Sequence, residues 1–195
     1  MLAAYIYTAC DSENKDDSFV IWDICPIEYN IFISDSKGND LLDSTYQNNI
    51  IKEVSVSYEG EDFPLLNEYE ARNRICGQSS TRAYFAIFYG LFLRQYWNNK
   101  TFSNDNFEMI FGEFSGTENI DLREMILNLP NNQHISLAYK NSFKWKQNGD
   151  PEKTTLFYLN GQEIKDDAGK QGIYHFRYSE SGICEYIPMN HGDFF

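Results

Sequence analysis

Short apolar runs that alternate with polar residues recur along this chain, and clusters of Gly, Asn and Asp separate them. The clearest run is EVSVSYEG at 53–60. Its alternation places Val54, Val56 and Tyr58 on one face and the serines on the other. A period of two is typical of a half-buried β-strand, because successive side chains of a strand point to opposite faces of the sheet. The same alternation predicts a strand over 28–34.

Turn signals between these runs predict hairpins. Asn160-Gly161 lies between two apolar runs, and Asn-Gly is the strongest short hairpin signal because both residues tolerate the positive φ angles of a two-residue turn. Two more hairpins are predicted, around Pro130-Asn131-Asn132 and at Gly60-Glu61-Asp62. Further strands are predicted at 19–24, 107–115 and 172–179, with one long strand or two strands broken at Gly90 over 83–97, and a modest helix candidate only at 66–75.

Many short strands at this spacing predict an all-β fold, with an immunoglobulin-like β-sandwich and little helix as the expected architecture. Aromatic residues make up 16% of the chain, and they favour the same class because their side chains pack well on a half-buried pleated surface. With 195 residues, the chain has the length of one domain or of two small ones.

The N-terminal segment has the sharpest change of composition in the chain. Residues 1–9 (MLAAYIYTA) are apolar and uncharged, and the polar stretch 11–18 (DSENKDDS) follows Cys10 directly. An apolar segment, small residues, a cysteine and a polar tether are the parts of a lipoprotein signal. We therefore expect 1–9 to be a signal segment, truncated because no Lys or Arg precedes it, and Cys10 to carry the lipid. A first β-strand with a buried cysteine is the alternative.

The stretch 11–18 has no apolar side chain to bury, so we expect a flexible tether. It contains Lys15, Asp16 and Asp17, a lysine followed by two acids. This triplet resembles the surface-export signal of Bacteroidetes lipoproteins, which implies a domain on the outer face of the outer membrane. The predicted organisation is a signal segment at 1–9, an acylated cysteine and tether at 10–18, and one or more β-sandwich domains over 19–195.

Several strand and turn signatures occur along the chain: Trp22-Asp23-Ile24 with Pro26, Gly38-Asn39-Asp40-Leu41-Leu42, Tyr58-Glu59-Gly60, Phe111-Gly112-Glu113-Phe114, Phe143-Lys144-Trp145-Lys146 and Tyr158-Leu159-Asn160-Gly161. Together they resemble a group of small Bacteroidetes lipoproteins of uncharacterised function. The resemblance spans most of the chain and implies an anchored β-sandwich. Its motifs carry no chemistry, so it implies no reaction.

The formal net charge of −13 makes nucleic acid an unexpected partner, because phosphate backbones repel an acidic chain. An anionic membrane surface would not hold the chain by charge either. Membrane attachment must therefore be covalent or hydrophobic, in agreement with a lipid on Cys10.

The four cysteines and three histidines form no catalytic or metal-binding motif. The chain has no CxxC, HExxH, GxSxG or Gly-rich phosphate loop, so we expect no enzyme, no metal and no cofactor. A Cys–His nucleophilic pair formed by the fold is the alternative. If Cys10 is lipidated, then Cys25, Cys76 and Cys184 are compatible both with one disulfide and with none. Separately, Asp43-Ser44-Thr45 resembles the O-glycosylation site of Bacteroidetes envelope proteins, which makes Ser44 a candidate acceptor.

Three functions are compatible with the sequence. The first is a binding or adhesion module that stacks the sugars of a glycan on exposed rings, with Trp97, Tyr139 and Trp145 as candidates. The second is a structural or accessory component of an outer-membrane complex, recognised by a sheet edge or an apolar patch. The third is a hydrolase whose site sequence does not reveal. Coplanar exposed rings would favour a glycan ligand, and a flat apolar patch would favour a protein partner. A deep pocket with clustered carboxylates, or a Cys–His contact, would favour a hydrolase.

Overall fold

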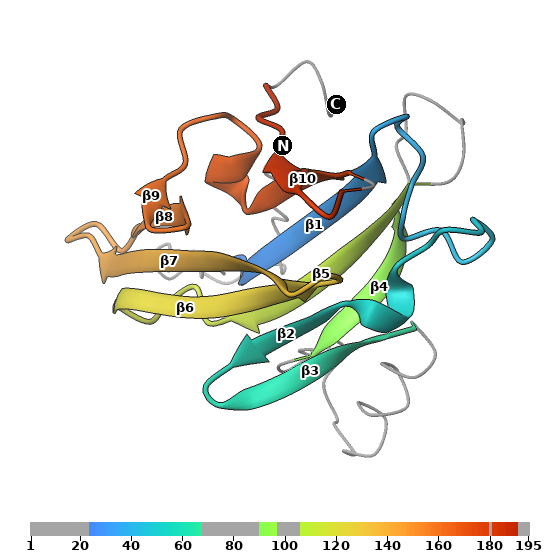
Figure 1. The fold of residues 1–195 in the computed structure, drawn as a ribbon. Helices are drawn as coiled ribbons and strands as arrows, with labels where there is room; N and C mark the ends of the chain where they lie inside the picture. The colour runs from blue at the N-terminus through green and yellow to red at the C-terminus, as the bar shows by residue number, and fades with distance from the viewer. Residues whose placement is uncertain (1–23, 68–89, 97–105, 180, 191–195) are drawn as a thin grey trace, which may run out of the picture.

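The computed structural model describes residues 24–67, 90–96, 106–179 and 181–190 (Figure 1). Its regular structure is almost entirely strand, which confirms the prediction of an all-β fold with little helix. No helix in these ranges has the length and apolar character that crossing a membrane requires. The elements are β1 (Ile27–Asp35), η1 (Ile51–Glu53), β2 (Ser55–Tyr58), β3 (Glu61–Leu66), β4 (Leu91–Tyr96), β5 (Asn106–Phe114), β6 (Ile120–Leu129), β7 (Gln133–Trp145), β8 (Pro151–Leu159), β9 (Gln162–Glu163), η2 (Gly169–Gln171), β10 (Ile173–Tyr178) and β11 (Cys184–Tyr186), where η denotes a single 3-10 turn.

The strands form one sheet of 11, in the order β11-β10-β1-β5-β4-β3-β2-β6-β7-β8-β9 (Figure 1). The sheet curls, so that its two halves face each other across the core. Tyr29 of β1 illustrates this, since its ring centroid lies 6.3 Å from that of Tyr139 in β7 and 5.6 Å from that of Phe157 in β8. The immunoglobulin-like arrangement is not confirmed, because a single sheet supplies both layers and the pairs β1–β10 and β3–β4 are parallel.

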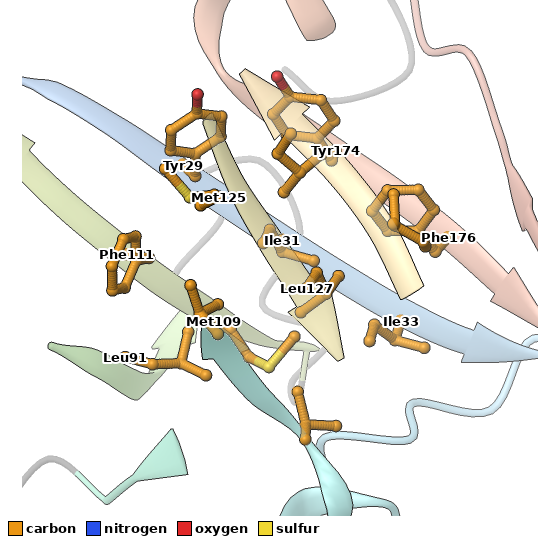
Figure 2. Close-up of a cluster of buried hydrophobic side chains, with 14 of the residues drawn as sticks. Tyr29, Ile31, Ile33, Leu91, Met109, Phe111, Met125, Leu127, Tyr174 and Phe176 are labelled. Carbon is orange, nitrogen blue, oxygen red and sulfur yellow. The ribbon is translucent and has the colours of Figure 1, made fainter. Parts of the chain in front are cut away.

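The burial of side chains follows the alternation of the sequence. Tyr29, Ile31 and Ile33, which the pattern of 28–34 places on one face of β1, are all buried. Figure 2 shows them meeting Met125 and Leu127 of β6, a strand from the other half of the curled sheet. Full burial of a side chain of this size stabilises the fold by about 1.5–3 kcal/mol.

The predicted turns are present, and one of them is displaced by a residue. Asn160 and Gly161 join β8 to β9 with φ angles of 49° and 78°, as a two-residue hairpin turn requires. Pro130-Asn131-Asn132 joins β6 to β7. The third turn is formed by Glu59 and Gly60 rather than by 60–62, because Tyr58 pairs with Glu61 and leaves only these two residues in the loop.

The predicted strands at 107–115 and 172–179 correspond to β5 and β10. The half of 83–97 that follows Gly90 corresponds to β4. The helix candidate at 66–75 and the predicted strand at 19–24 lie almost wholly outside the described residues.

Two hydroxyl groups in the core, those of Tyr29 and Tyr174, have no hydrogen-bond partner in the described part of the chain. Their rings stack with centroids 5.7 Å apart, and in Figure 2 both hydroxyls point to the same side. Burial raises the pKa of both phenols well above its ordinary value, so both stay neutral at all ordinary pH values.

We expect Tyr29→Phe and Tyr174→Phe to leave the free energy of unfolding unchanged or to raise it by about 1 kcal/mol, because a buried hydroxyl without a partner costs about 1–3 kcal/mol. Urea denaturation measures the change. Tyr139→Phe is the matched control and should lose about 1 kcal/mol, because Arg123 donates a hydrogen bond of 3.2 Å to the Tyr139 hydroxyl. Equal losses in all three variants would show that the first two hydroxyls have partners as well.

Candidate functional site

A cleft opens where β2 and β6 diverge. β2 pairs with β6 only over 55–57, opposite 126–128, and the chain then turns away at Glu59 and Gly60 into β3. β6 begins at Ile120, so its first half extends past the end of β2. The cleft has a volume of about 390 Å³, and it is lined by Tyr58, Glu59, Asn119, Ile120, Asp121, Leu122, Arg123 and Glu124.

Arg123 forms the inner wall of this cleft. The carbon at the centre of its guanidinium lies 5.4 Å from the ring centroid of Phe114. One nitrogen of the same group donates to the Tyr139 hydroxyl at 3.2 Å, and another lies 3.7 Å from a carboxylate oxygen of Glu118. A cation over an aromatic face contributes about 0.5–2 kcal/mol, depending on its exposure. These contacts hold the guanidinium against the core, and the Arg123 side chain is only 20% exposed.

Three carboxylates, those of Glu59, Asp121 and Glu124, stand around the cleft. The Tyr58 hydroxyl donates to Glu59 at 2.8 Å, and the Ser136 hydroxyl donates to Glu124 at 2.5 Å. Asp121 is exposed. With Arg123 turned inward, the rim of the cleft is acidic.

Exposed apolar side chains adjoin the cleft on the outer face of the sheet. Leu156 of β8 lies directly opposite Lys140 of β7. On the other side of β7, Leu122 falls between the pairs Ile120–Asn141 and Arg123–Tyr139, where the pairing of β6 with β7 shifts register beside Lys140. Leu122 is 56% and Leu156 39% exposed. The Lys140 ammonium lies 5.5 Å from the ring centroid of Tyr158 and so leans along the strand. We call Leu122, the Lys140 stem and Leu156 the outer apolar row.

Of the aromatic side chains proposed for glycan stacking, the two that the structure describes do not form a platform. Tyr139 is fully buried in the core, and its hydroxyl accepts the hydrogen bond from Arg123. Trp145 is 55% exposed at the end of β7 and packs edge-on against Phe143, with centroids 5.2 Å apart. Trp97 lies outside the described residues. A single exposed candidate ring therefore remains in the described part of the chain.

The predicted modification site is a surface turn. Ser44 is exposed, and the neighbouring Asp43 carboxylate accepts hydrogen bonds from the Thr45 backbone and hydroxyl at 2.7 and 2.8 Å. This Asx turn fixes the backbone and leaves the Ser44 side chain on the surface. The predicted lipid acceptor Cys10 and the export residues Lys15, Asp16 and Asp17 lie outside the described residues, as does Cys76.

Among the described residues, Ser34 and His175 make a Ser–His contact that the sequence did not reveal. The Ser34 hydroxyl lies 2.8 Å from Nε2 of His175, across the parallel pair β1–β10. Burial, and then the charge of Arg177, lower the pKa of His175, so the ring is neutral at pH 7. Among the described residues no carboxylate bonds to this ring, and neither residue lines the cleft. We interpret the contact as a tie between two strands. No local signal could have found it, because the partners are 141 positions apart.

The other candidate chemistry is not assembled in the described ranges. Cys25 and Cys184 are free thiols, and burial raises the pKa of Cys184 to about 12. No group of three side chains suited to a metal ion occurs there either. The candidate site that remains in the described part of the chain is an acidic cleft beside an exposed apolar row. The chain matches no family model, no curated protein and no solved structure.

Proposed function

We propose that this chain is a lipid-anchored binding module of the bacterial outer membrane that recognises a protein partner through the outer apolar row and the adjoining cleft. The observation that carries the choice of a protein is the exposure of Leu122 and Leu156 on either side of Lys140. Scattered exposed leucines are ordinary, but exposed leucines that flank the same residue on one sheet face form an apolar surface of the kind found at protein–protein interfaces. The anchor rests on the sequence pattern around Cys10.

A protein partner fits the described surface better than a glycan does. Sugar recognition by stacking needs exposed ring faces, and of the candidate rings Tyr139 is buried. An accessory component of an outer-membrane complex is one form that such a module takes.

The position of the site relative to the predicted tether supports a partner close to the membrane. The described part of the chain begins at Ile24, and the Lys153 ammonium donates to the carbonyl of the next residue, Cys25, at 2.7 Å. Gly116 packs against the same carbonyl, and a Cβ added there would lie only 2.5 Å from it. Asn119, three positions further on, already lines the cleft. The predicted tether, residues 11–18, would be at most about 30 Å long when fully extended, so a lipid on Cys10 would hold residue 19 within about that distance of the bilayer.

A photo-crosslinking side chain tests this proposal in intact cells. Placed at Leu122 or Leu156, it should give one discrete protein adduct, whereas Ile183, which is 63% exposed in the turn before β11, should give none. Leu156→Asp should then lower the yield from position 122 at least about tenfold, because burial of a leucine contributes about 1.5–3 kcal/mol. Equal adducts from position 183, or a yield that Leu156→Asp leaves unchanged, would contradict a partner at this surface.

A further inference from the structure

The hairpin of β7 and β8 ends in an exposed aromatic and basic tip, which belongs neither to the cleft nor to the outer apolar row. β7 ends with Phe143, Lys144 and Trp145, and the turn begins with Lys146. Trp145 is 55% exposed, and the side chains of Lys144 and Lys146 are 66% and 48% exposed. This end of β7 lies at the edge of the molecule (Figure 1). We call residues 143–153 the hairpin tip.

The contacts within the hairpin tip hold Trp145 in place. Its ring packs edge-on against the buried Phe143, with centroids 5.2 Å apart. The Lys146 backbone donates to the Asp150 carbonyl at 2.8 Å and closes the turn. The Asn148 side chain donates to the Asp150 carboxylate at 2.6 Å. The exposed indole therefore stands on a closed turn, so that little conformational entropy is lost when a ligand covers it.

The described part of the chain begins beside the hairpin tip. Lys153 pairs with Phe143 across the ladder, and its ammonium donates to the carbonyl of Cys25 at 2.7 Å. Trp145 lies only about 7 Å further along β7 than Phe143. The chain that leads from the predicted anchor at Cys10 therefore joins the described fold at the end that carries the exposed tryptophan.

The side chains of the tip suit the interface between a bilayer and water. Tryptophan is enriched there because its ring is apolar while its N–H stays hydrated. Lysine lays its stem along apolar surface and keeps its ammonium among the headgroups. Lys144 and Lys146 lie 3.1 and 4.0 Å from Glu152, but ion pairs this exposed are weak. Both ammonium groups are therefore available to lipid phosphates.

The local charge of the hairpin tip differs from that of the whole chain. Residues 143–153 contain three lysines and two acids, whereas the chain carries a net charge of −13. Headgroup phosphates repel a surface of net negative charge and attract lysine. The hairpin tip is therefore suited to face the bilayer.

We propose that the hairpin tip places Trp145 in the headgroup region of the bilayer that holds the lipid of Cys10, with Lys144 and Lys146 at the phosphates. This inference rests on the proposed anchor. A lone tryptophan is a weak signal, so the lipid supplies the attachment and the tip fixes the orientation of the domain. Lys140 of the outer apolar row precedes Trp145 in β7 by about 17 Å, which keeps the row close to the membrane.

The fluorescence of Trp145 on vesicles tests the proposal. Trp22→Phe and Trp97→Phe leave Trp145 as the only tryptophan of the full chain. Six histidines in place of residues 5–10 attach this chain to phosphatidylcholine vesicles that contain a nickel-chelating lipid. Phosphatidylcholine with brominated acyl chains should then quench at least half of the Trp145 emission, because bromine quenches an indole only at close range.

Charge reversals separate the tip from the rest of the surface. Lys144→Glu combined with Lys146→Glu should lower the quenching at least twofold, because two acids at the tip are repelled by the phosphates. Lys52→Glu combined with Lys170→Glu is the matched control at exposed positions of η1 and η2, and it should leave the quenching unchanged. Matching thermal midpoints verify that the variants fold, and the quenching of the parent decides alone where a variant does not.

Trp145 emission that brominated lipid does not quench would overturn the inference, as would equal quenching losses in the two double variants. A photo-crosslinking side chain at position 145 in intact cells should give a lipid adduct, and a protein adduct in its place would also overturn it. Because histidines hold the chain on the vesicles, the fluorescence result does not depend on acylation of Cys10. Fractionation with a labelled fatty acid decides the anchor separately.

Discussion

Replacing Gly172 by alanine is expected to remove much of the stability of this fold, lowering the free energy of unfolding by about 2–5 kcal/mol. Gly172 ends η2 with a φ of 78°, which costs an L-residue with a side chain about 1–2 kcal/mol. A Cβ at this position would overlap the backbone oxygen of Glu28 and lie 3.0 Å from the Phe157 ring. Relief of such a clash needs a backbone shift, which costs a further amount of about 1–3 kcal/mol.

The position matters because Gly172 aligns the parallel pair of β1 and β10. Its carbonyl accepts a hydrogen bond of 2.8 Å from the Asn30 backbone, immediately before the paired stretch begins at Ile173. A shift of this residue would disturb the register that places Tyr174 in the core beside Tyr29. A domain whose total stability is about 5–15 kcal/mol would lose a large part of it.

Gly161→Ala separates the clash from the backbone conformation. Gly161 has the same φ of 78°, but no heavy atom lies within 4 Å of a Cβ built there. Its replacement should cost only about 1–2 kcal/mol, the conformational part of the effect. Urea denaturation measures the free energy of unfolding of the two variants. Equal losses would show that the close approach of the Glu28 backbone is not the reason why position 172 requires glycine.

The local elements of this fold are readable from sequence because their causes are local. Burial of Val54, Val56 and Tyr58 follows from a period of two, and the Asn160-Gly161 turn follows from the φ angles that these residues tolerate. The same rule shows why Tyr139 was a poor candidate for glycan stacking. It shares its parity in β7 with Ile135 and Leu137, and all three are buried.

The pairing of distant strands has no such local cause. β1 pairs with β10, more than 130 positions away, and β3 pairs with β4 in parallel. Because no local pattern encodes these pairings, the sequence alone could not distinguish the single curled sheet from two separate sheets. The cleft is a product of this non-local pairing. Both β2 and β6 were expected as strands, but their divergence depends on the register of Ser57 opposite Ile126. Leu122 and Leu156 likewise become neighbours only across β7.

Cys10→Ala is expected to transfer the protein from the membrane fraction to the soluble fraction. Each methylene of an acyl chain buried in a bilayer contributes about 0.8 kcal/mol, and stable anchoring takes two chains. If Cys10 carries the proposed lipid, loss of its thiol would therefore remove the whole attachment. Charge would not replace it, because a chain of net charge −13 is repelled by an anionic membrane surface. Fractionation of cells with a labelled fatty acid measures both the location and the modification.

Cys25→Ala is the matched control, because Cys25 is an exposed free thiol at the start of the described fold. Its carbonyl, which no side-chain substitution removes, accepts the hydrogen bond from Lys153, so the variant should fold and stay with the membrane. The alternative for Cys10, a buried residue of a first strand, makes the opposite prediction. Cys10→Ala would then lower the free energy of unfolding and leave both the fractionation and the label unchanged, because the thiol would contribute packing rather than attachment. The two measurements on one pair of variants therefore decide between an anchored module and a chain that reaches its partner without a lipid.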